Sequence, residues 1–211
     1  MSAAAAIASN PWGVLVRRDH VVVIGMPGCG KTPFAAALAA EARRVVYFDP
    51  TGEWAPLGEV VTGEDVRAAA DPQSELLAGT FMRVVVVPED ERLAEDFEAT
   101  VAACRAAARF GGLVLLVDEV GDLNPACVET LQGLHRNGHK DGVATILVSP
   151  CASDIPKRCR DTASRVFSFF QKNHRDRQTL ADEYGDDFAR RAATWRHPLP
   201  PAEWTNPTLH A

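Results

Sequence analysis

The sequence contains no long hydrophobic run, and its N-terminus has no basic stretch ahead of an apolar segment. Its apolar runs, such as Leu113–Val117, fall far short of the roughly 18 residues that a membrane span requires. A basic stretch followed by an apolar one would mark a secretory signal. We therefore expect a soluble, intracellular chain with no transmembrane segment of its own.

Cysteine pairs are missing as well. The five cysteines are odd in number and form no CxxC pair. A disulfide framework is therefore not expected, and a reducing compartment is the simpler context. Cys151 and Cys159, with His135 and His139 upstream, could be read as a metal cluster, but the two cysteines are too far apart for a zinc knuckle. We favour buried thiols and a histidine pair near a helix end.

No charge of one sign dominates, since 22 Lys and Arg stand against 28 Asp and Glu, a formal net charge of −6. With 46% apolar and 24% charged residues, the composition excludes intrinsic disorder, a collagen-like fibre and a strongly basic nucleic-acid coat. The 211 residues suit one domain. We expect that domain over 1–196, with an N-terminal arm at 1–12 and a Pro-rich C-terminal tail at 197–211.

Nearly continuous apolar, β-branched runs alternate with helical patterns. Such runs are typical of parallel strands covered on both faces, and they predict strands at Val21–Gly25, Val45–Asp49, Arg83–Val87, Leu113–Asp118, Val143–Ser149 and Arg165–Phe170. Apolar residues at helical spacing predict helices at Lys31–Arg43, at Glu91–Phe110, from Pro125 to a stop at Asn137–Gly138, and a helix or helix pair between 175 and 195. The alternation predicts an α/β fold with a mainly parallel central sheet and helices on both faces.

Gly25–Thr32 reads GMPGCGKT and matches the phosphate-loop pattern GxxxxGK[ST] between a predicted strand and a predicted helix. Glycines allow the torsions that turn successive N–H groups toward an anion, and the helix N-terminus adds partial positive charge. Lys31 supplies a positive charge for the β- and γ-phosphates, and the Thr32 hydroxyl supplies a ligand for Mg²⁺. We expect ATP with Mg²⁺ here, held by Pro27, Gly28, Cys29, Gly30, Lys31, Thr32 and Pro33.

The apolar run Leu113–Val117 is followed by two carboxylates, Asp118 and Glu119. An Asp at the carboxyl edge of the sheet can hold the Mg²⁺ hydration shell near the phosphate loop, and a neighbouring Glu can orient or deprotonate a water molecule. We predict Asp118 as the metal ligand, with Glu119 and Lys31 as catalytic groups. At least two strand-like segments separate the phosphate loop from this pair. That order resembles the RecA-like, additional-strand branch of P-loop ATPases rather than the kinase–GTPase branch.

A second predicted strand runs into Asp49-Pro50-Thr51-Gly52-Glu53-Trp54. An Asp-Pro turn with a glycine is common in proteins, and from the residues alone we favour that interpretation. The alternative is functional: Asp49 and Glu53 leave the sheet at the edge that carries the phosphate loop, where they could sense the γ-phosphate.

Four segments together resemble the FtsK–HerA superfamily of DNA-translocating ATPases: GMPGCGKT (25–32), DPTGEW (49–54), LVLLVDE (113–119) and RNGHKDGVATILVSP (136–150). The first and third motifs are widespread among ATPases, whereas the second and fourth narrow the choice. A bare motor of this size is similar to the genome-packaging ATPases of tailless, membrane-containing icosahedral viruses. The resemblance implies a RecA-like P-loop NTPase fold.

The resemblance also implies partners and further site residues. It implies an ATP-fuelled homo-oligomeric ring that pushes double-stranded DNA into a preformed capsid, in the host cytoplasm or on the virion, with capsid or membrane-vertex proteins as further partners. Arg136 matches a family arginine that reaches the neighbouring subunit's nucleotide, and Arg165 is a second candidate for that role. Pro150 replaces the family glutamine that ends the fifth strand, so Ser149 is the candidate phosphate sensor. His139 replaces a second family arginine.

Basic residues gather in one stretch, because nine Lys and Arg stand against four Asp between residues 136 and 177. A basic stretch on an otherwise acidic motor suits a pore that grips phosphates without reading sequence. We expect DNA contacts from Lys157, Arg158 and Arg160. Two other functions stay open: a cellular or plasmid DNA translocase of the conjugation type, and a nucleotide-dependent assembly switch.

Overall fold

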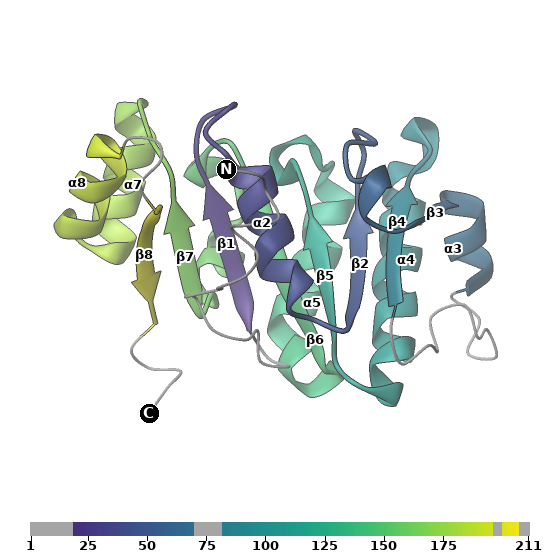
Figure 1. Ribbon diagram of the computed structural model, residues 1–211. Coiled ribbons are helices and arrows are strands. Elements are labelled where there is room, and N and C mark those ends of the chain that lie inside the picture. The colour runs from purple at the N-terminus through teal and green to yellow at the C-terminus, as the bar shows by residue number, and fades with distance from the viewer. Residues whose placement is uncertain (1–18, 70–81, 196–199, 207–211) are drawn as a thin grey trace.

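The central element of the fold is an eight-stranded sheet, which extends from β8 at the left of Figure 1 to β3 at the right. The computed structural model describes residues 19–69, 82–195 and 200–206. The strands lie in the order β3-β4-β2-β5-β6-β1-β7-β8, and every neighbouring pair is parallel except β7 with β8. Their bounds are β1 His20–Ile24, β2 Arg44–Phe48, β3 Glu59–Thr62, β4 Met82–Val87, β5 Leu113–Val117, β6 Val143–Ser149, β7 Arg165–Ser168 and β8 Ala202–Thr205.

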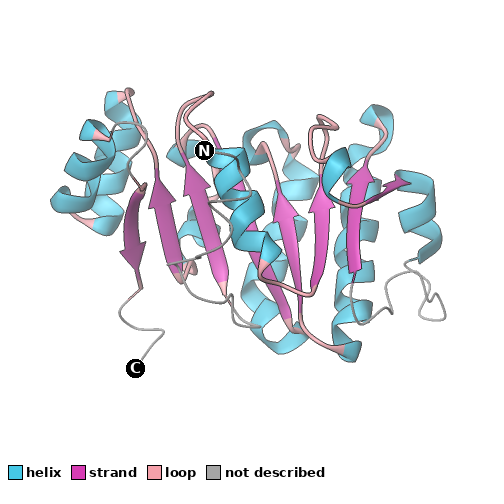
Figure 2. Ribbon diagram, viewed as in Figure 1, coloured by secondary structure: helices cyan, strands magenta, loops and turns pink. Residues whose placement is uncertain are grey.

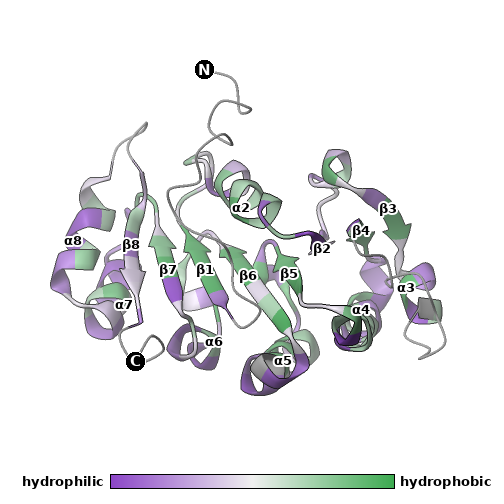
Figure 3. Ribbon diagram, turned by 60° about the horizontal axis from the view of Figure 1, so that its bottom comes forward, coloured by the Kyte–Doolittle hydropathy of each residue, from purple (hydrophilic) through white to green (hydrophobic). Residues whose placement is uncertain are grey.

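Helices cover both faces of the sheet, as Figure 3 shows from below. Helix α2 lies on one face, helices α4, α5 and α6 lie on the other, α3 lies beside the β3 edge, and α7 and α8 lie beside the β8 edge. Their bounds are α2 Lys31–Ala40, α3 Gly63–Ala69, α4 Leu93–Ala107, α5 Pro125–Asp141, α6 Lys157–Asp161, α7 His174–Tyr184 and α8 Asp186–Thr194. The expected α/β fold with helices on both faces is confirmed.

The core is divided by the sheet into two layers. Along β1, Val22 and Ile24 belong to the layer under α4 and α5, whereas Val21 and Val23 belong to the layer under α2. All four side chains are fully buried. Burial on both faces explains why the strand sequences are apolar without alternation, the feature from which the parallel sheet was predicted.

The strand order places the site. Strand β6 lies between β5 and β1, which is the additional-strand arrangement that the sequence predicted. Because the carboxyl ends of parallel strands meet at one edge, the loops after β1, β2, β5 and β6 emerge together at the top of Figure 2. Those loops begin with Gly25, Asp49, Asp118 and Pro150.

The predicted helix Lys31–Arg43 already ends at Ala40, and two further boundaries need correction. Helix α5 does not stop at Asn137–Gly138 but continues to Asp141, where Gly142 (φ +74°) takes the left-handed conformation that ends helices. Residues 202–205, which the sequence assigned to the tail, form the antiparallel edge strand β8. Trp204 of β8 packs against Tyr184 with 4.8 Å between ring centroids, so this stretch belongs to the domain.

Several expectations concern features that the described residues only partly cover. The predicted arm at 1–12 lies outside them. Across 19–69, 82–195 and 200–206, no helix is long and apolar enough to cross a membrane. The five cysteines are free thiols, and Cys104, Cys127 and Cys159 are buried. The same residues contain no group of three or more His, Cys, Asp or Glu side chains that could hold a metal ion.

A buried histidine pair lies at the amino edge of the sheet. The rings of His20 and His135 stack with 4.1 Å between centroids. Thr145 Oγ1 lies 3.0 Å from His20 Nδ1 and 3.0 Å from His135 Nε2, and Thr162 Oγ1 lies 3.0 Å from His135 Nδ1. Burial, with the neighbouring His20 ring, lowers the pKa of His135 well below its ordinary value.

This shift predicts acid-sensitive stability. Below the ordinary histidine pKa of about 6.5, residue 135 binds a proton in the unfolded chain. In the folded protein it stays neutral there, because its pKa is lowered. The free energy of unfolding should therefore be unaffected by this group above that pH, and it should fall by about 1.4 kcal/mol per pH unit below it. We expect His135→Ala to flatten the fall in unfolding free energy between pH 7.5 and 5.5, measured by urea denaturation. The exposed His174, replaced by Ala, serves as control; equal slopes for both variants and wild type would contradict the assignment.

Candidate active site

The phosphate loop connects β1 to α2 and is anchored on the end of β6 and on the segment that follows β7. Gly25 N–H donates to Ser149 O (3.3 Å), and Met26 N–H donates to Phe170 O (3.2 Å). Gly28 (φ +75°) and Gly30 (φ +97°) take the left-handed conformation that a nest of inward-facing amides requires. These torsions are compatible with an anion-binding loop at the N-terminus of α2, and phosphate binding by this loop stays a prediction.

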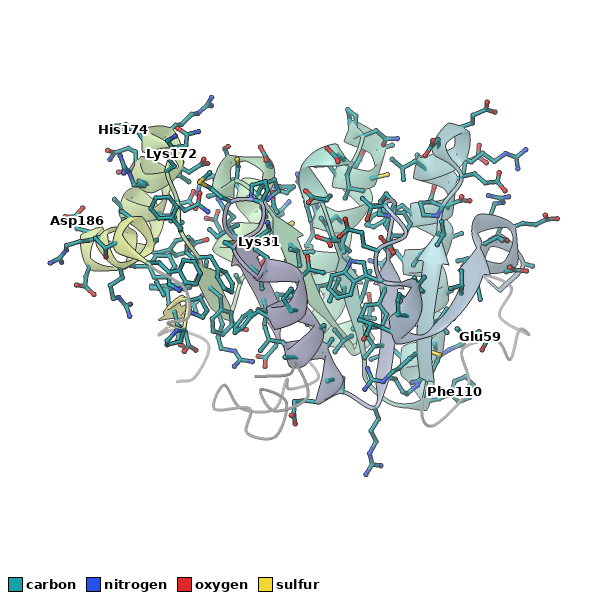
Figure 4. All side chains as sticks on the ribbon, turned by 45° about the horizontal axis from the view of Figure 1, so that its top comes forward. Lys31, Glu59, Phe110, Lys172, His174 and Asp186 are labelled. Atoms are coloured by element: carbon teal, nitrogen blue, oxygen red, sulfur yellow. The ribbon has the colours of Figure 1, made fainter. Side chains whose placement is uncertain are left out.

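Lys31 is the first residue of α2 and carries its charge at this loop (Figure 4). Its side chain is buried, and Nζ donates to Met26 O over 3.4 Å. Thr32 follows, half-buried, and Pro33 is exposed in the first helical turn, where an N–H has no helical acceptor. Cys29 is half-buried; burial raises the pKa of its thiol, and the Lys31 charge opposes that rise.

Gly25 and Gly28 differ in the space around them, which gives a matched test of the loop. A Cβ on Gly25 would lie 2.5 Å from Phe169 Cβ and 2.9 Å from Cys29 Sγ, whereas a Cβ on Gly28 meets nothing within 4 Å. We expect Gly25→Ala to cost about 1–3 kcal/mol of overpacking in addition to backbone strain, and to abolish nucleotide binding. Gly28→Ala should cost only the left-handed strain of about 1–2 kcal/mol. Thermal unfolding and nucleotide titration check both; equal losses would contradict the account.

The two predicted carboxylates follow β5 directly. Asp118 is buried, with Oδ1 accepting the Glu119 N–H (2.9 Å). Glu119 is half-buried and has φ +47°, the one positive φ outside glycine among the described residues. Burial raises the pKa of Asp118, and the Lys31 charge lowers it. Burial and the Asp118 charge raise the pKa of Glu119, again against Lys31. Lys31 affects the pKa of both acids, so the phosphate loop and the acidic pair after β5 lie at the same edge of the sheet, close enough to interact.

The turn after β2 contains a contact that the sequence did not reveal. The Trp54 indole N–H donates to Asp118 Oδ2 over 2.7 Å, and Trp54 is 1% exposed. Asp49, predicted as a sensor, is committed to its own turn: it is fully buried, Oδ1 accepts from Thr51 and Gly52, and Oδ2 accepts the Trp54 N–H (2.7 Å). The prediction for Asp49 is therefore corrected to a structural role.

Glu53 and Ser149 both lie at the carboxyl edge where they were predicted. Glu53 is exposed, and its charge contributes to the raised pKa of Glu119. Ser149 ends β6, pairs with Ile24 in register and is fully buried. Its Oγ accepts the Cys151 N–H over 3.3 Å. Their sensor roles stay predictions.

The two candidate arginine fingers occupy different environments at the edge away from the phosphate loop. Arg136 is exposed on α5, next to the His135 that stacks on the first residue of β1. Arg165 is the first residue of β7 and only 9% exposed; its guanidinium lies 3.8 Å from Asp19 and 5.8 Å from the ring centroid of Phe167. Because a finger must reach out to a neighbouring subunit, the prediction for Arg165 is corrected, and Arg136 alone stays a candidate.

The three residues predicted to contact DNA differ in their exposure to solvent. Arg160 is 9% exposed and forms a bidentate ion pair with Glu183 (2.7 and 2.8 Å), while its Nη1 donates to the carbonyls of Ala152 and Ile155. Its guanidinium holds α6 against α7 and is not available to DNA, so this prediction is corrected. Lys157 and Arg158 are exposed; the first pairs with Asp161 over 2.8 Å.

The oxygen ligands fit a magnesium ion. Thr32 and Asp118 offer a hydroxyl and a carboxylate, the hard donors that Mg²⁺ prefers, and such sites complete their coordination with phosphate oxygens and water. Asp118 already accepts one hydrogen bond on each oxygen, which leaves further acceptor capacity on both. The donor set therefore suits a metal bound through a triphosphate and water molecules.

No protein-family model matches this sequence, and no curated protein matches it. Among solved structures, the chain is similar to the genome packaging NTPase B204 from Sulfolobus turreted icosahedral virus 2 in complex with AMPPCP, at 18% identity and a TM-score of 0.64 over 85% of this chain and 89% of that chain. It is also similar to B204, the DNA-packaging ATPase from Sulfolobus turreted icosahedral virus, at 21% identity and a TM-score of 0.64 over 85% of this chain and 88% of that chain.

A third similar structure is that of EccC from Thermomonospora curvata (ATPases 2 and 3), at 16% identity and a TM-score of 0.54 over 88% of this chain and 37% of that chain. At these identities the comparisons show a shared fold. Together with the phosphate loop, that fold defines a P-loop NTPase of the RecA-like α/β class. The fold implied by the sequence resemblance to FtsK–HerA and viral packaging ATPases is therefore confirmed.

Proposed function

We propose that this chain is an ATP-hydrolysing motor that translocates double-stranded DNA and packages a viral genome into a preformed capsid. The main support for this proposal is that Lys31 of the phosphate loop and the carboxylates Asp118 and Glu119 lie at the same edge of the sheet. The similarity in fold to B204, a genome packaging NTPase, supports packaging as the use of that chemistry.

The chemistry follows from the positions of the side chains. The loop amides and Lys31 would bind the phosphates, since both carry positive charge at the N-terminus of α2. Bound at Thr32 and Asp118, Mg²⁺ would neutralise charge that develops on the phosphates. Glu119, with its pKa raised by burial and by Asp118, would accept the proton of an attacking water molecule.

Hydrolysis alone does not move DNA, so the proposal includes assembly. A homo-oligomeric ring would let Arg136 of one subunit reach the nucleotide of the next, as its exposure permits. The DNA would pass through the ring and contact basic side chains such as Lys157 and Arg158. Capsid or membrane-vertex proteins would hold the ring at the virion, so we propose action in the host cytoplasm or on the virion.

ATP turnover with and without duplex DNA tests this function. We expect Mg²⁺-dependent turnover that duplex DNA stimulates and that salt suppresses, because phosphate contacts weaken as salt rises. Turnover that ignores DNA would favour a nucleotide-dependent assembly switch. The alternative that the sequence left open is a cellular or plasmid DNA translocase; co-purification with capsid proteins in infected cells would favour packaging over that alternative.

A further inference from the structure

Trp54 donates a hydrogen bond to the predicted metal ligand Asp118. Its indole N–H lies 2.7 Å from Asp118 Oδ2, across 64 residues of sequence. Trp54 is 1% exposed and Asp118 is 3% exposed, so water does not compete for this hydrogen bond. A hydrogen bond to a buried charged acceptor is shorter and about twice as strong as one between neutral groups.

The indole is held rigidly from two sides. Its rings stack on Tyr47 with 5.4 Å between centroids and 26° between planes. The Tyr47 hydroxyl in turn accepts from Arg83 over 3.2 Å. The Trp54 backbone N–H donates to Asp49 Oδ2 over 2.7 Å, and Asp49 Oδ1 closes the turn on Gly52. The turn after β2 thus fixes where the indole nitrogen points.

The Asp118 carboxylate is oriented by donors on both of its oxygens. Glu119 N–H donates to Oδ1 over 2.9 Å, and the Trp54 indole donates to Oδ2. One donor alone would let the carboxylate turn about its Cβ–Cγ bond, whereas two donors on different oxygens fix its plane. Each oxygen keeps further acceptor capacity, so the fixed plane still presents lone pairs to a metal-bound water molecule.

We propose that Trp54 is a positioning residue that sets the orientation of Asp118 toward the metal. This inference rests on the proposed function, because it assigns Asp118 to a metal-bound triphosphate. It also gives Asp49 a part in the site: by holding the turn, Asp49 places the indole that places Asp118. Groups that orient a metal ligand in this way are commonly worth 10-fold to 100-fold in metal affinity or activity.

Trp54→Phe removes the N–H and keeps an aromatic ring for Tyr47 to stack on. We expect the Mg²⁺ concentration for half-maximal turnover to rise about 10-fold, with kcat reduced by about 10-fold to 100-fold. Trp204→Phe, in the edge strand beside Tyr184, is the matched control and should leave both quantities unchanged. Circular dichroism verifies that both variants fold. Wild-type Mg²⁺ dependence in a folded Trp54→Phe variant would overturn the proposal.

A second readout needs no turnover. In a ¹H–¹⁵N spectrum, the four tryptophans give indole N–H signals, and the signal absent from Trp54→Phe identifies residue 54. We expect this signal to lie downfield, to exchange slowly with solvent and to move upfield in Asp118→Ala. A signal that Asp118→Ala leaves in place would overturn the contact. A shift in this signal together with a wild type that hydrolyses no ATP would instead refute the proposed function, so the two failures are distinguishable.

Discussion

Replacing Glu119 with glutamine is expected to lower ATP turnover by about 10²-fold to 10⁴-fold, the usual contribution of a positioned general base. Glutamine keeps the shape of the side chain but cannot accept the proton of the attacking water. Nucleotide affinity should stay within a few-fold of wild type, because the phosphate loop and Lys31 are untouched. Single-turnover hydrolysis and nucleotide titration together measure the two effects.

The matched control for this variant is Glu129→Gln, which removes an exposed carboxylate from α5. It should leave turnover unchanged. If Glu119→Gln retained turnover within about threefold of wild type, Glu119 would not be the base. If it lost nucleotide binding as well, the loss would indicate that the substitution disturbs the segment after β5, where Glu119 has a left-handed backbone with φ +47°.

Replacing Arg136 with alanine is expected to abolish hydrolysis by the assembled ring while sparing nucleotide binding. An arginine supplied to a neighbouring nucleotide is worth about 10³-fold to 10⁵-fold in related phosphoryl-transfer systems. Within its own subunit Arg136 is exposed at the edge away from the phosphate loop, beside the stacked histidines, so binding should not change. Turnover as a function of protein concentration measures the effect.

Mixing variants isolates the role of Arg136 between subunits. Lys31→Ala subunits cannot hold nucleotide but carry an intact Arg136, and Arg136→Ala subunits have the opposite defect. A mixture of the two should regain part of the wild-type turnover, because at some subunit interfaces an intact phosphate loop with Lys31 faces an intact Arg136. The exposed Arg43, which has no proposed role in the site, is replaced by alanine as the control for loss of surface charge. Wild-type turnover in Arg136→Ala, or a mixture as inactive as its components, would contradict the finger role.

The parallel sheet and the phosphate loop could be predicted from sequence because local patterns encode both. Strands buried on both faces leave continuous apolar runs, as in Leu113–Val117, and the nest of amides needs glycines at fixed spacing. Strand β3 was missed because three of its four residues are exposed and carry no period. Strand β8 was missed because prolines precede it, although proline is tolerated beside an edge strand.

The remaining errors concern contacts between segments far apart in sequence. Arg160 looked like a surface cation, since nothing local predicts that Glu183, 23 residues later, faces it in the interior. The Trp54–Asp118 hydrogen bond spans 64 residues and depends on β2 and β5 being neighbours. The sequence placed the turn after β2 and the acidic pair at one edge, but the hydrogen bond between the indole and the carboxylate became visible only in the structure.

The most direct test of the catalytic arrangement is a crystal structure of the Glu119→Gln variant with ATP and Mg²⁺. We expect a triphosphate wrapped by the amides of Gly28–Thr32, with Lys31 Nζ at its outer phosphates. We also expect an ion on the Thr32 hydroxyl and, directly or through water, on an Asp118 carboxylate still hydrogen-bonded to the Trp54 indole. A triphosphate bound elsewhere, or an Asp118 turned away from the ion, would contradict the account.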